Sequence, residues 1–426
     1  MYQPRTKDLS ESQRGVAREI ATKLQTAGKQ AWLVGGLVRD LALGLKPSDV
    51  DITTDARPEE VEAIFDETIP VGRAFGTVIV RVGGMESEVT TFRSESSYSD
   101  ARHPDSVTFS KTPEEDAERR DFTCNALYLD PLSDRVLDPT GGLADLEAGR
   151  LRCVGDPRER FGEDALRILR LARFTAEPGL TPEPETIEAA RELAGKLKLI
   201  APERRLREVT SMLRRSNPLR AMECLRECDA LRWALFDGDD VATVECHERI
   251  ALFRESGVRG AAGLAVLFAS YDPKVVGGTG SAAWREQLRA LRPSRELLNE
   301  VQAIGLEVRA IDELVALGEE APRSELIKAL RSPEFAPGLE IAQARASLAG
   351  ADCSGLAELA RQHETLSPDE LRPEPFITSS DLEVVGVPRG PLWSELLNEA
   401  ETRQLDGELP DRETALTWLR ARAEDS

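Results

Sequence analysis

The chain begins with apolar positions whose spacing changes from helical to strand-like. Val16, Ile20 and Leu24 recur every four residues, which predicts an amphipathic helix over residues 9–29. The apolar run at residues 31–34 is too short for a helix and is typical of a buried strand. The N-terminal segment therefore predicts a helix that leads into one strand of a sheet.

Glycines punctuate the pattern directly after this strand. Gly35 and Gly36 predict a tight turn, because glycine tolerates backbone angles that other residues avoid. The apolar residues at 37–43 predict a helix that ends at Gly44. The order is therefore strand, tight turn and helix.

A second strand is predicted where apolar and acidic residues alternate. Val50 and Ile52 alternate with Asp49 and Asp51. Because successive side chains of a strand point to opposite faces, the two carboxylates share a face, about 6–7 Å apart. The alternation predicts paired acidic side chains opposite a buried apolar face.

The rest of the pattern divides the chain into a mixed part and a helical part. Apolar runs at 78–82 and 87–92 flank Gly83-Gly84 and predict a hairpin, so the fold class is α+β. From about residue 157 the pattern is helical. The expected segments are a mixed segment over 1–150, helical segments over 151–235 and 236–366, and a small helical tail over 367–426.

The net charge restricts the partners of the chain. There are 55 Lys and Arg residues against 76 Asp and Glu residues, which gives a net charge of −21. Such a chain binds nucleic acid only if its basic residues gather on one face, and the arginine-rich stretch 150–226 is the candidate. A surface adapted for solubility is the simpler interpretation of the acidity.

Cysteine spacing and hydropathy exclude several classes of protein. The six cysteines form no CxxC pair, so no structural zinc site is predicted. The polar N-terminus and the absence of a run of about 18 apolar residues predict neither a secretion signal nor a membrane span. We expect a cytoplasmic protein with no membrane partner, and the sequence indicates no oligomeric state.

The acidic strand supplies candidate metal ligands. Mg²⁺ takes one or two carboxylates together with phosphates and water, and Asp49 and Asp51 offer such a pair. Most pairs of this kind are solvated surface, but here a glycine turn precedes them and lets the backbone approach a triphosphate. Glu88, in the predicted strand at 87–92, is a candidate third carboxylate. We expect Mg²⁺ at Asp49 and Asp51, with Glu88 assisting catalysis.

The order of strand, glycine turn, helix and acidic strand resembles the active site of the polymerase-beta superfamily. In that arrangement Gly35, Gly36 and Arg39 would contact a nucleotide triphosphate. The competing nucleotide-binding motifs GxxxxGK[ST] and GxGxxG are absent from the sequence. The pattern therefore favours nucleotidyl transfer.

Two downstream segments carry further candidate nucleotide ligands. Within residues 119–126, Arg120 suits phosphates, and Asp121 and Asn125 can bond sugar hydroxyls. A charged helix terminus explains the same residues equally well. Residues 160–174 predict one amphipathic helix with a polar stripe, where salt bridges at i,i+4 spacing would contribute only about 0.2–0.5 kcal/mol each.

Five segments in this order resemble the class II CCA-adding enzymes and bacterial poly(A) polymerases, the tRNA nucleotidyltransferase family. The matching segments are Gly35–Asp51, Arg119–Ala126, Asp138–Leu146, Glu163–Arg167 and Pro202–Arg215. The resemblance implies a polymerase-beta-like catalytic head over 1–150, nucleotide- and RNA-binding neck helices, a helical body and a tail. It also implies nucleotide-binding roles for Arg39, Arg120, Asp121, Asn125, Asp164, Arg167, Arg170 and Arg173.

The resemblance assigns base selection to Asp164 and Arg167, and hydrogen-bonding chemistry agrees. Cytosine and adenine both present an amino donor beside a ring-nitrogen acceptor, which a carboxylate and a guanidinium complement. Uracil and guanine reverse both groups, and each mismatch would leave a buried polar group unpaired at a cost of about 1–3 kcal/mol. A pair of side chains can therefore replace a nucleic-acid template.

Members of the family differ in what they add. We expect CMP and AMP, from CTP and ATP, to be added as CCA to the 3′ end of tRNA. Residues 94–109 resemble the family's flexible loop at full length, which disfavours a CC-adding enzyme, and the acidic chain disfavours a poly(A) polymerase. An A-adding enzyme, a bacterial poly(A) polymerase and a catalytically silent RNA-binding homologue remain alternatives.

The helical part carries the expected RNA contacts. Arg204, Arg205, Arg207 and Arg214 would hold the RNA backbone by charge and shape, although salt-bridged surface residues would look the same. The body resembles a degenerate HD-like region. It keeps His247 but has no following His-Asp pair, so no second metal site is predicted.

Overall fold

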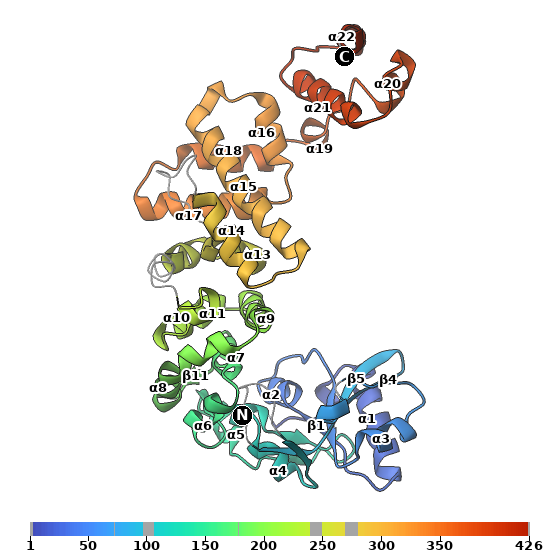
Figure 1. Cartoon of the computed structure of the whole chain (residues 1–426), viewed down its shortest axis with the longest axis vertical. Coiled ribbons are helices and arrows are strands. Elements are labelled where there is room, and N and C mark those ends of the chain that lie inside the picture. Colours follow the sequence, from blue (N-terminus) through green and yellow to red (C-terminus); the bar gives the residue numbers. More distant parts are fainter. Residues whose placement is uncertain are drawn as a thin grey trace. The chain divides into compact units, whose positions relative to one another are not determined.

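The structure is a computed structural model that describes residues 3–71, 73–96, 106–177, 179–238, 249–268 and 280–424. The chain forms two compact units, Met1–His247 with Ala290–Arg292, and Glu248–Arg289 with Pro293–Ser426. All strands of the described residues lie in the first unit, and the second is built from helices (Figure 1).

A seven-stranded sheet in the order β3-β4-β5-β2-β1-β8-β9 organises the first unit. Its strands are β1 (Trp32–Val34), β2 (Asp51–Thr54), β3 (Thr68–Ile69), β4 (Thr77–Val82), β5 (Met85–Thr91), β8 (Tyr128–Leu129) and β9 (Val136–Leu137). Two-stranded sheets are formed by β6 (Arg93–Ser96) with β7 (Ser106–Phe109), and by β10 (Arg150–Leu151) with β11 (Thr181–Pro182). The α+β prediction is confirmed.

Short helices accompany the sheet. They are α1 (Glu11–Thr26), α2 (Gly36–Ala42), α3 (Pro58–Ile64), α4 (Pro113–Glu118) and α5 (Gly142–Glu147). Ser10 begins α1 with a capping box, in which its side chain accepts from the Gln13 backbone while the Gln13 side chain accepts from the Ser10 backbone. The predicted hairpin is confirmed, because β4 and β5 pair across Gly83-Gly84.

Further helices complete the first unit. They are α6 (Pro157–Glu163), α7 (Leu166–Thr175), α8 (Pro184–Leu193), α9 (Pro202–Leu213), α10 (Pro218–Glu227) and α11 (Leu231–Leu235). The prediction of one helix over 160–174 is wrong, because the backbone of Asp164 is extended at φ −137° and ψ 103°. Its carboxylate accepts the Leu166 N–H at 2.9 Å, so a short polar side chain ends one helix and begins the next.

The second unit consists of helices in the described part of the chain. They are α13 (Gly260–Phe268), α14 (Gly280–Ala290), α15 (Arg295–Leu317), α16 (Arg323–Leu330), α17 (Phe335–Ala349), α18 (Ser354–Thr365), α19 (Pro368–Leu371), α20 (Ser379–Val385), α21 (Pro391–Leu405) and α22 (Arg412–Glu424). Across the residues that the structure describes, no helix is long and apolar enough to cross a membrane.

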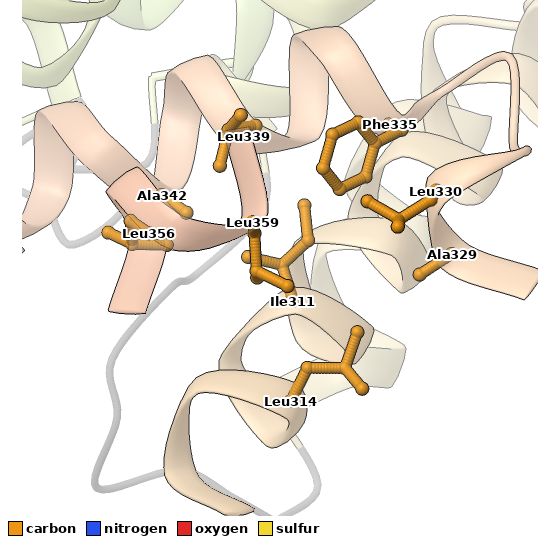
Figure 2. Packing of buried hydrophobic residues seen from close by; sticks show 9 residues of the cluster. All are labelled: Ile311, Leu314, Ala329, Leu330, Phe335, Leu339, Ala342, Leu356 and Leu359. Atoms are coloured by element: carbon orange, nitrogen blue, oxygen red, sulfur yellow. The ribbon is translucent and has the colours of Figure 1, made fainter. Parts of the chain in front are cut away.

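Two apolar clusters hold this unit together. Figure 2 shows the first, in which side chains of α15, α16, α17 and α18 converge: Ile311, Leu314, Ala329, Leu330, Phe335, Leu339, Ala342, Leu356 and Leu359. The second lies among α20, α21 and α22 and includes Leu382, Leu396 and Leu419. The expected tail therefore has its own core, and Arg331, directly after α16, also pairs with Glu401 of α21 at 2.7 Å.

We expect Phe335→Ala to lower the free energy of unfolding by about 3–5 kcal/mol, because it opens a cavity in the cluster of Figure 2. Leu348→Ala, on the same helix, is the control, since that side chain is 52% exposed. Chemical denaturation followed by circular dichroism measures both. Equal losses in the two variants would contradict the assignment of Phe335 to the core.

Candidate active site

Acidic side chains gather in a cleft where β2 and β5 lie side by side. The cleft has a volume of about 290 Å³ and is lined by Asp49, Val50, Asp51, Ile79, Glu86, Ser87 and Glu88. The parallel register places Asp51 directly opposite Glu88, and Asp49 lies two residues before the start of β2. The structure thus brings together Asp49, Asp51 and Glu88, as the alternating pattern predicts.

Crowding of negative charge changes the acidity of one of these groups. Burial, and then repulsion from Glu88 and Asp49, raises the pKa of Asp51 to about 6, although the positive charge of Arg120 acts in the opposite direction. A bound cation would relieve this repulsion. In the described part of the chain no three Asp, Glu, His or Cys side chains come together tightly enough to hold a metal ion. A metal here would thus need further oxygens, such as phosphate or water.

The glycine turn lies beside the acidic strand. β1 pairs with β2, with Leu33 opposite Ile52, and Gly35 follows β1 with φ 71° and ψ −135°. A Cβ at Gly35 would lie 3.8 Å from Nη1 of Arg120. Arg120 therefore lies beside the turn, and its positive charge also acts on the carboxylate of Asp51.

A buried acid holds Arg120 in place. Asp116 is fully buried and lies 2.8 Å from Arg120 and 2.7 Å from Arg119, and it also accepts the Tyr128 hydroxyl at 2.9 Å. Burial alone would raise the pKa of Asp116, but the two guanidinium groups hold it well below its usual range. Asp116 was not predicted as a site residue, although its i,i+4 spacing to Arg120 in the sequence was an available signal.

The other predicted nucleotide ligands are joined into one network. Arg39 is 4% exposed and donates to Oδ1 of Asn125 at 2.8 Å and to Asp40. Asn125 donates to Asp121 at 3.2 Å, and Arg170 donates to the same carboxylate at 2.6 Å. Asp121 and Asn125 thus have protein partners here, and their contact with sugar hydroxyls remains a prediction.

One aromatic ring lies at the centre of this network. Phe174 is 4% exposed, and the guanidinium groups of Arg39, Arg170 and Arg173 lie 4.9, 5.5 and 4.8 Å from its ring centroid. Cations are attracted to the face of an aromatic ring. Phe174 therefore links α2 to α7. It was absent from the predicted site, because a buried Phe in a helical pattern carries no signal beyond packing.

Of the two residues expected to select the base, Asp164 lies at the break between α6 and α7, and Arg167 lies in the first turn of α7. Arg167 donates to Glu163 at 2.6 Å and to the carbonyl oxygens of Arg160 and Arg119 at 3.0 and 2.9 Å. The Glu163–Arg167 pair expected from helical spacing is therefore present. Asp164 accepts the Leu166 N–H and lies 3.4 Å from Nη2 of Arg204.

The arginines of α9 do not share one role. Arg207 and Arg214 are exposed, and no described carboxylate pairs with either. Arg205 is 1% exposed, and its Nη1 donates to the Trp233 carbonyl oxygen at 2.5 Å. The prediction that Arg205 contacts RNA is wrong for this structure, because its guanidinium is buried between α9 and α11.

Two family models match the first unit. The model described as "Poly A polymerase head domain" matches residues 31–152, and "Probable RNA and SrmB- binding site of polymerase A" matches residues 179–235. The CCA-adding enzyme of Streptococcus pyogenes serotype M2 is 45% identical over 214 residues, which is 50% of this chain and 53% of that enzyme. The CCA-adding enzyme of Levilactobacillus brevis is 46% identical over 198 residues, 46% of this chain and 50% of the enzyme. The chain thus spans about half the length of these curated relatives.

Solved structures extend the similarity over nearly the whole chain. The CCA-adding enzyme of Bacillus stearothermophilus in complex with CTP is 29% identical, with a TM-score of 0.71, covering 98% of this chain and 100% of that one. The Thermotoga maritima CCA-adding enzyme complexed with tRNA is 22% identical, with a TM-score of 0.64 over 97% and 96% of the two chains. At that identity the second similarity concerns the fold alone.

The sheet with its acidic cleft, followed by helices, defines a polymerase-beta-like nucleotidyltransferase head; the described residues after it are helical except for the two-residue strand β11. Residues 31–152 and 179–235 are similar to the poly(A) polymerase head and RNA-binding families, and the chain is similar to CCA-adding enzymes. The fold class and the resemblance predicted from the sequence are confirmed.

The raised pKa of Asp51 predicts a pH-dependent stability in the absence of metal. An acid whose pKa is higher in the folded than in the unfolded chain does not lower the free energy of unfolding below about pH 4, because it is protonated in both states. It lowers that free energy fully above about pH 6, where it is ionised in both states. We expect the free energy of unfolding of Asp51→Asn to equal that of the wild type near pH 4 and to exceed it by up to about 3 kcal/mol at pH 7.5. Denaturant unfolding in EDTA measures this, with the exposed Asp66→Asn as control. A difference that stays constant with pH would contradict the raised pKa.

Proposed function

We propose that the protein adds CMP and AMP, from CTP and ATP, to the 3′ end of tRNA and so builds the CCA terminus without a nucleic-acid template. The observation that carries the proposal is the acidic cleft of Asp49, Asp51 and Glu88 beside the Gly35 turn and Arg120. The same activity is supported by similarity to CCA-adding enzymes, about half of whose length is matched, and to a structural neighbour that binds CTP.

Asp49 and Asp51 would hold Mg²⁺, because hard carboxylate oxygens on a shared cleft suit this ion when phosphates and water complete its shell. When bound, the ion would lower the pKa of the attacking hydroxyl and neutralise the triphosphate. Glu88, opposite Asp51, would accept the proton of the RNA 3′-hydroxyl. The reaction is an in-line displacement at the α-phosphate that releases pyrophosphate.

The remaining residues would bind and select the nucleotide. The peptide groups of Gly35 and Gly36 and the guanidinium of Arg120 would contact the triphosphate. Arg39, Asp121, Asn125, Arg170 and Arg173 form the network behind it and would orient the nucleotide. Asp164 and Arg167 would read the amino group and ring nitrogen of cytosine or adenine.

The division into segments belongs to the same proposal. Residues 1–150 would be the catalytic head, 151–235 the nucleotide- and RNA-binding neck, 236–366 the body and 367–426 the tail that meets tRNA. A cytoplasmic location is part of the proposal, and it is supported by described cysteines that are all free, as in reducing compartments.

Incorporation of labelled CTP and ATP into tRNA that ends at the discriminator base tests this function. We expect wild-type protein with Mg²⁺ to add two C residues and one A, and Asp51→Asn to lose at least about 10³-fold in kcat, because the metal loses a charged ligand. Asp66→Asn, an exposed substitution in the head, should keep wild-type activity.

Other products would identify the alternatives. Addition of A alone, and only to tRNA ending in CC, would identify an A-adding enzyme. Long A tails on unrelated RNA would identify a poly(A) polymerase. No addition with Mg²⁺ would leave a silent RNA-binding homologue, and full activity of Asp51→Asn would remove Asp51 from the catalytic site.

The exposed arginines of α9 should contribute to tRNA binding. We expect the double variant Arg207→Ala with Arg214→Ala to raise Kd for tRNA several-fold and to reduce the dependence of binding on salt, because each phosphate contact releases counterions. Filter binding at several salt concentrations measures both. Arg205→Ala should instead lower the unfolding midpoint, since the buried Arg205 guanidinium bonds the Trp233 carbonyl oxygen and Asp237. An unchanged salt dependence in the double variant would argue against an RNA contact.

A further inference from the structure

Two polar side chains of α9, one helical turn apart, face the segment that carries the base-selecting residues. Nη2 of Arg204 lies 3.4 Å from Oδ2 of Asp164, and Oε2 of Glu208 lies 3.1 Å from Nε of Arg173. Residues at i and i+4 share one face of a helix. α9 therefore presents a cation and an anion to complementary charges at the two ends of α7, against which it packs.

The two oxygens of Asp164 each have one protein donor nearby. Oδ1 accepts the Leu166 N–H at 2.9 Å, and Oδ2 has the Arg204 guanidinium at 3.4 Å. A carboxylate oxygen can accept two hydrogen bonds, so each oxygen keeps capacity for a further donor. Because the donors act on different oxygens, they restrict rotation of the carboxylate while leaving room for an exocyclic amino group.

Some buried polar atoms of this contact lack a hydrogen bond within the described residues. These atoms are Nη1 of Arg204, Nε of Arg173 and Oε2 of Glu208. The last two are close enough to attract each other as charges but are not aligned as donor and acceptor. Unsatisfied buried polar atoms cost about 1–3 kcal/mol each, so they are expected where a ligand or a small rearrangement completes the network.

Neighbouring arginines on α9 do not have this geometry. Arg205 is directed to the Trp233 carbonyl, and Arg207 is exposed and has no described ion-pair partner. Within the run from Arg204 to Arg207, only Arg204 contacts Asp164 in the described structure. Its side chain is 24% exposed, compared with 18% for Asp164, so solvent screens the contact only partly.

We propose that Arg204 is a positioning residue for base selection, which fixes the carboxylate of Asp164 in the orientation that accepts the amino group of cytosine or adenine. This inference rests on the proposed function. Without the guanidinium, Asp164 keeps only the Leu166 N–H as a donor and can turn away from the base. Selection of C over U would then weaken, because the carboxylate no longer meets the amino group in a fixed geometry.

The test compares kcat and KM for CTP and UTP in the full chain with Mg²⁺ and tRNA that ends at the discriminator base. We expect Arg204→Gln to raise KM for CTP about tenfold and to reduce the preference for CTP over UTP about tenfold, with a smaller change in kcat. Arg204→Lys should recover part of both losses, since an ammonium group can still reach the carboxylate. Arg191→Gln, at an exposed arginine of α8 that lies outside the proposed site, is the control and should keep wild-type selectivity.

Each other outcome has a defined meaning. Wild-type KM and selectivity in Arg204→Gln would overturn the inference while leaving the proposed function intact. Equal losses in the Gln and Lys variants, together with lower unfolding midpoints in both, would also overturn it, because Arg204 would then be purely structural. A wild-type protein that transfers no nucleotide would overturn the proposed function, and this inference with it.

Discussion

Burial of a carboxylate among other carboxylates is the constraint on which the cleft of the first unit depends. Burial, together with repulsion from Glu88 and Asp49, raises the pKa of Asp51 to about 6, so a charged Asp51 carries an energetic cost that a bound cation would offset. Arg120 offsets part of this cost from the side of the glycine turn. It can remain there because the fully buried Asp116 binds it from behind. The position of Arg120 beside the acidic cleft therefore depends on Asp116, an acid that does not line the cleft.

Pairing of an arginine with a nearby acid also occurs farther from the cleft. Such pairs explain how an acidic chain keeps many arginines at one place. Arg170 is paired with Asp121, Arg173 lies against Glu208, and both guanidinium groups contact the ring of Phe174. Each cation has its own counter-charge, so the network is held by local pairs rather than by the net charge of −21. A triphosphate would enter a region whose cations are already fixed in position, which avoids reorganisation on binding.

Local patterns predicted the parts of the site that depend on backbone geometry. Alternation around Val50 gave the strand and its acidic face, and Gly35-Gly36 gave the turn, because both follow from properties of single residues. The break at Asp164 was missed, since apolar residues keep helical spacing on both sides of it and only the capping bond to Leu166 reveals it. Arg205 was misplaced because neighbouring residues of a helix point in directions about 100° apart, and tertiary packing decides which direction is buried.

The residues that are proposed to read the base are fixed from several elements at once. Arg167 is held by Glu163 and by carbonyl oxygens of residues in α6 and at the end of α4, while Asp164 is held by α7 and by Arg204 of α9. Discrimination between bases requires donors and acceptors placed to within about 0.5 Å. Small movements of α9 or of the head against α7 would therefore alter base choice without touching the cleft of Asp49 and Asp51. Base selection and catalysis would therefore depend on different packing contacts within the first unit.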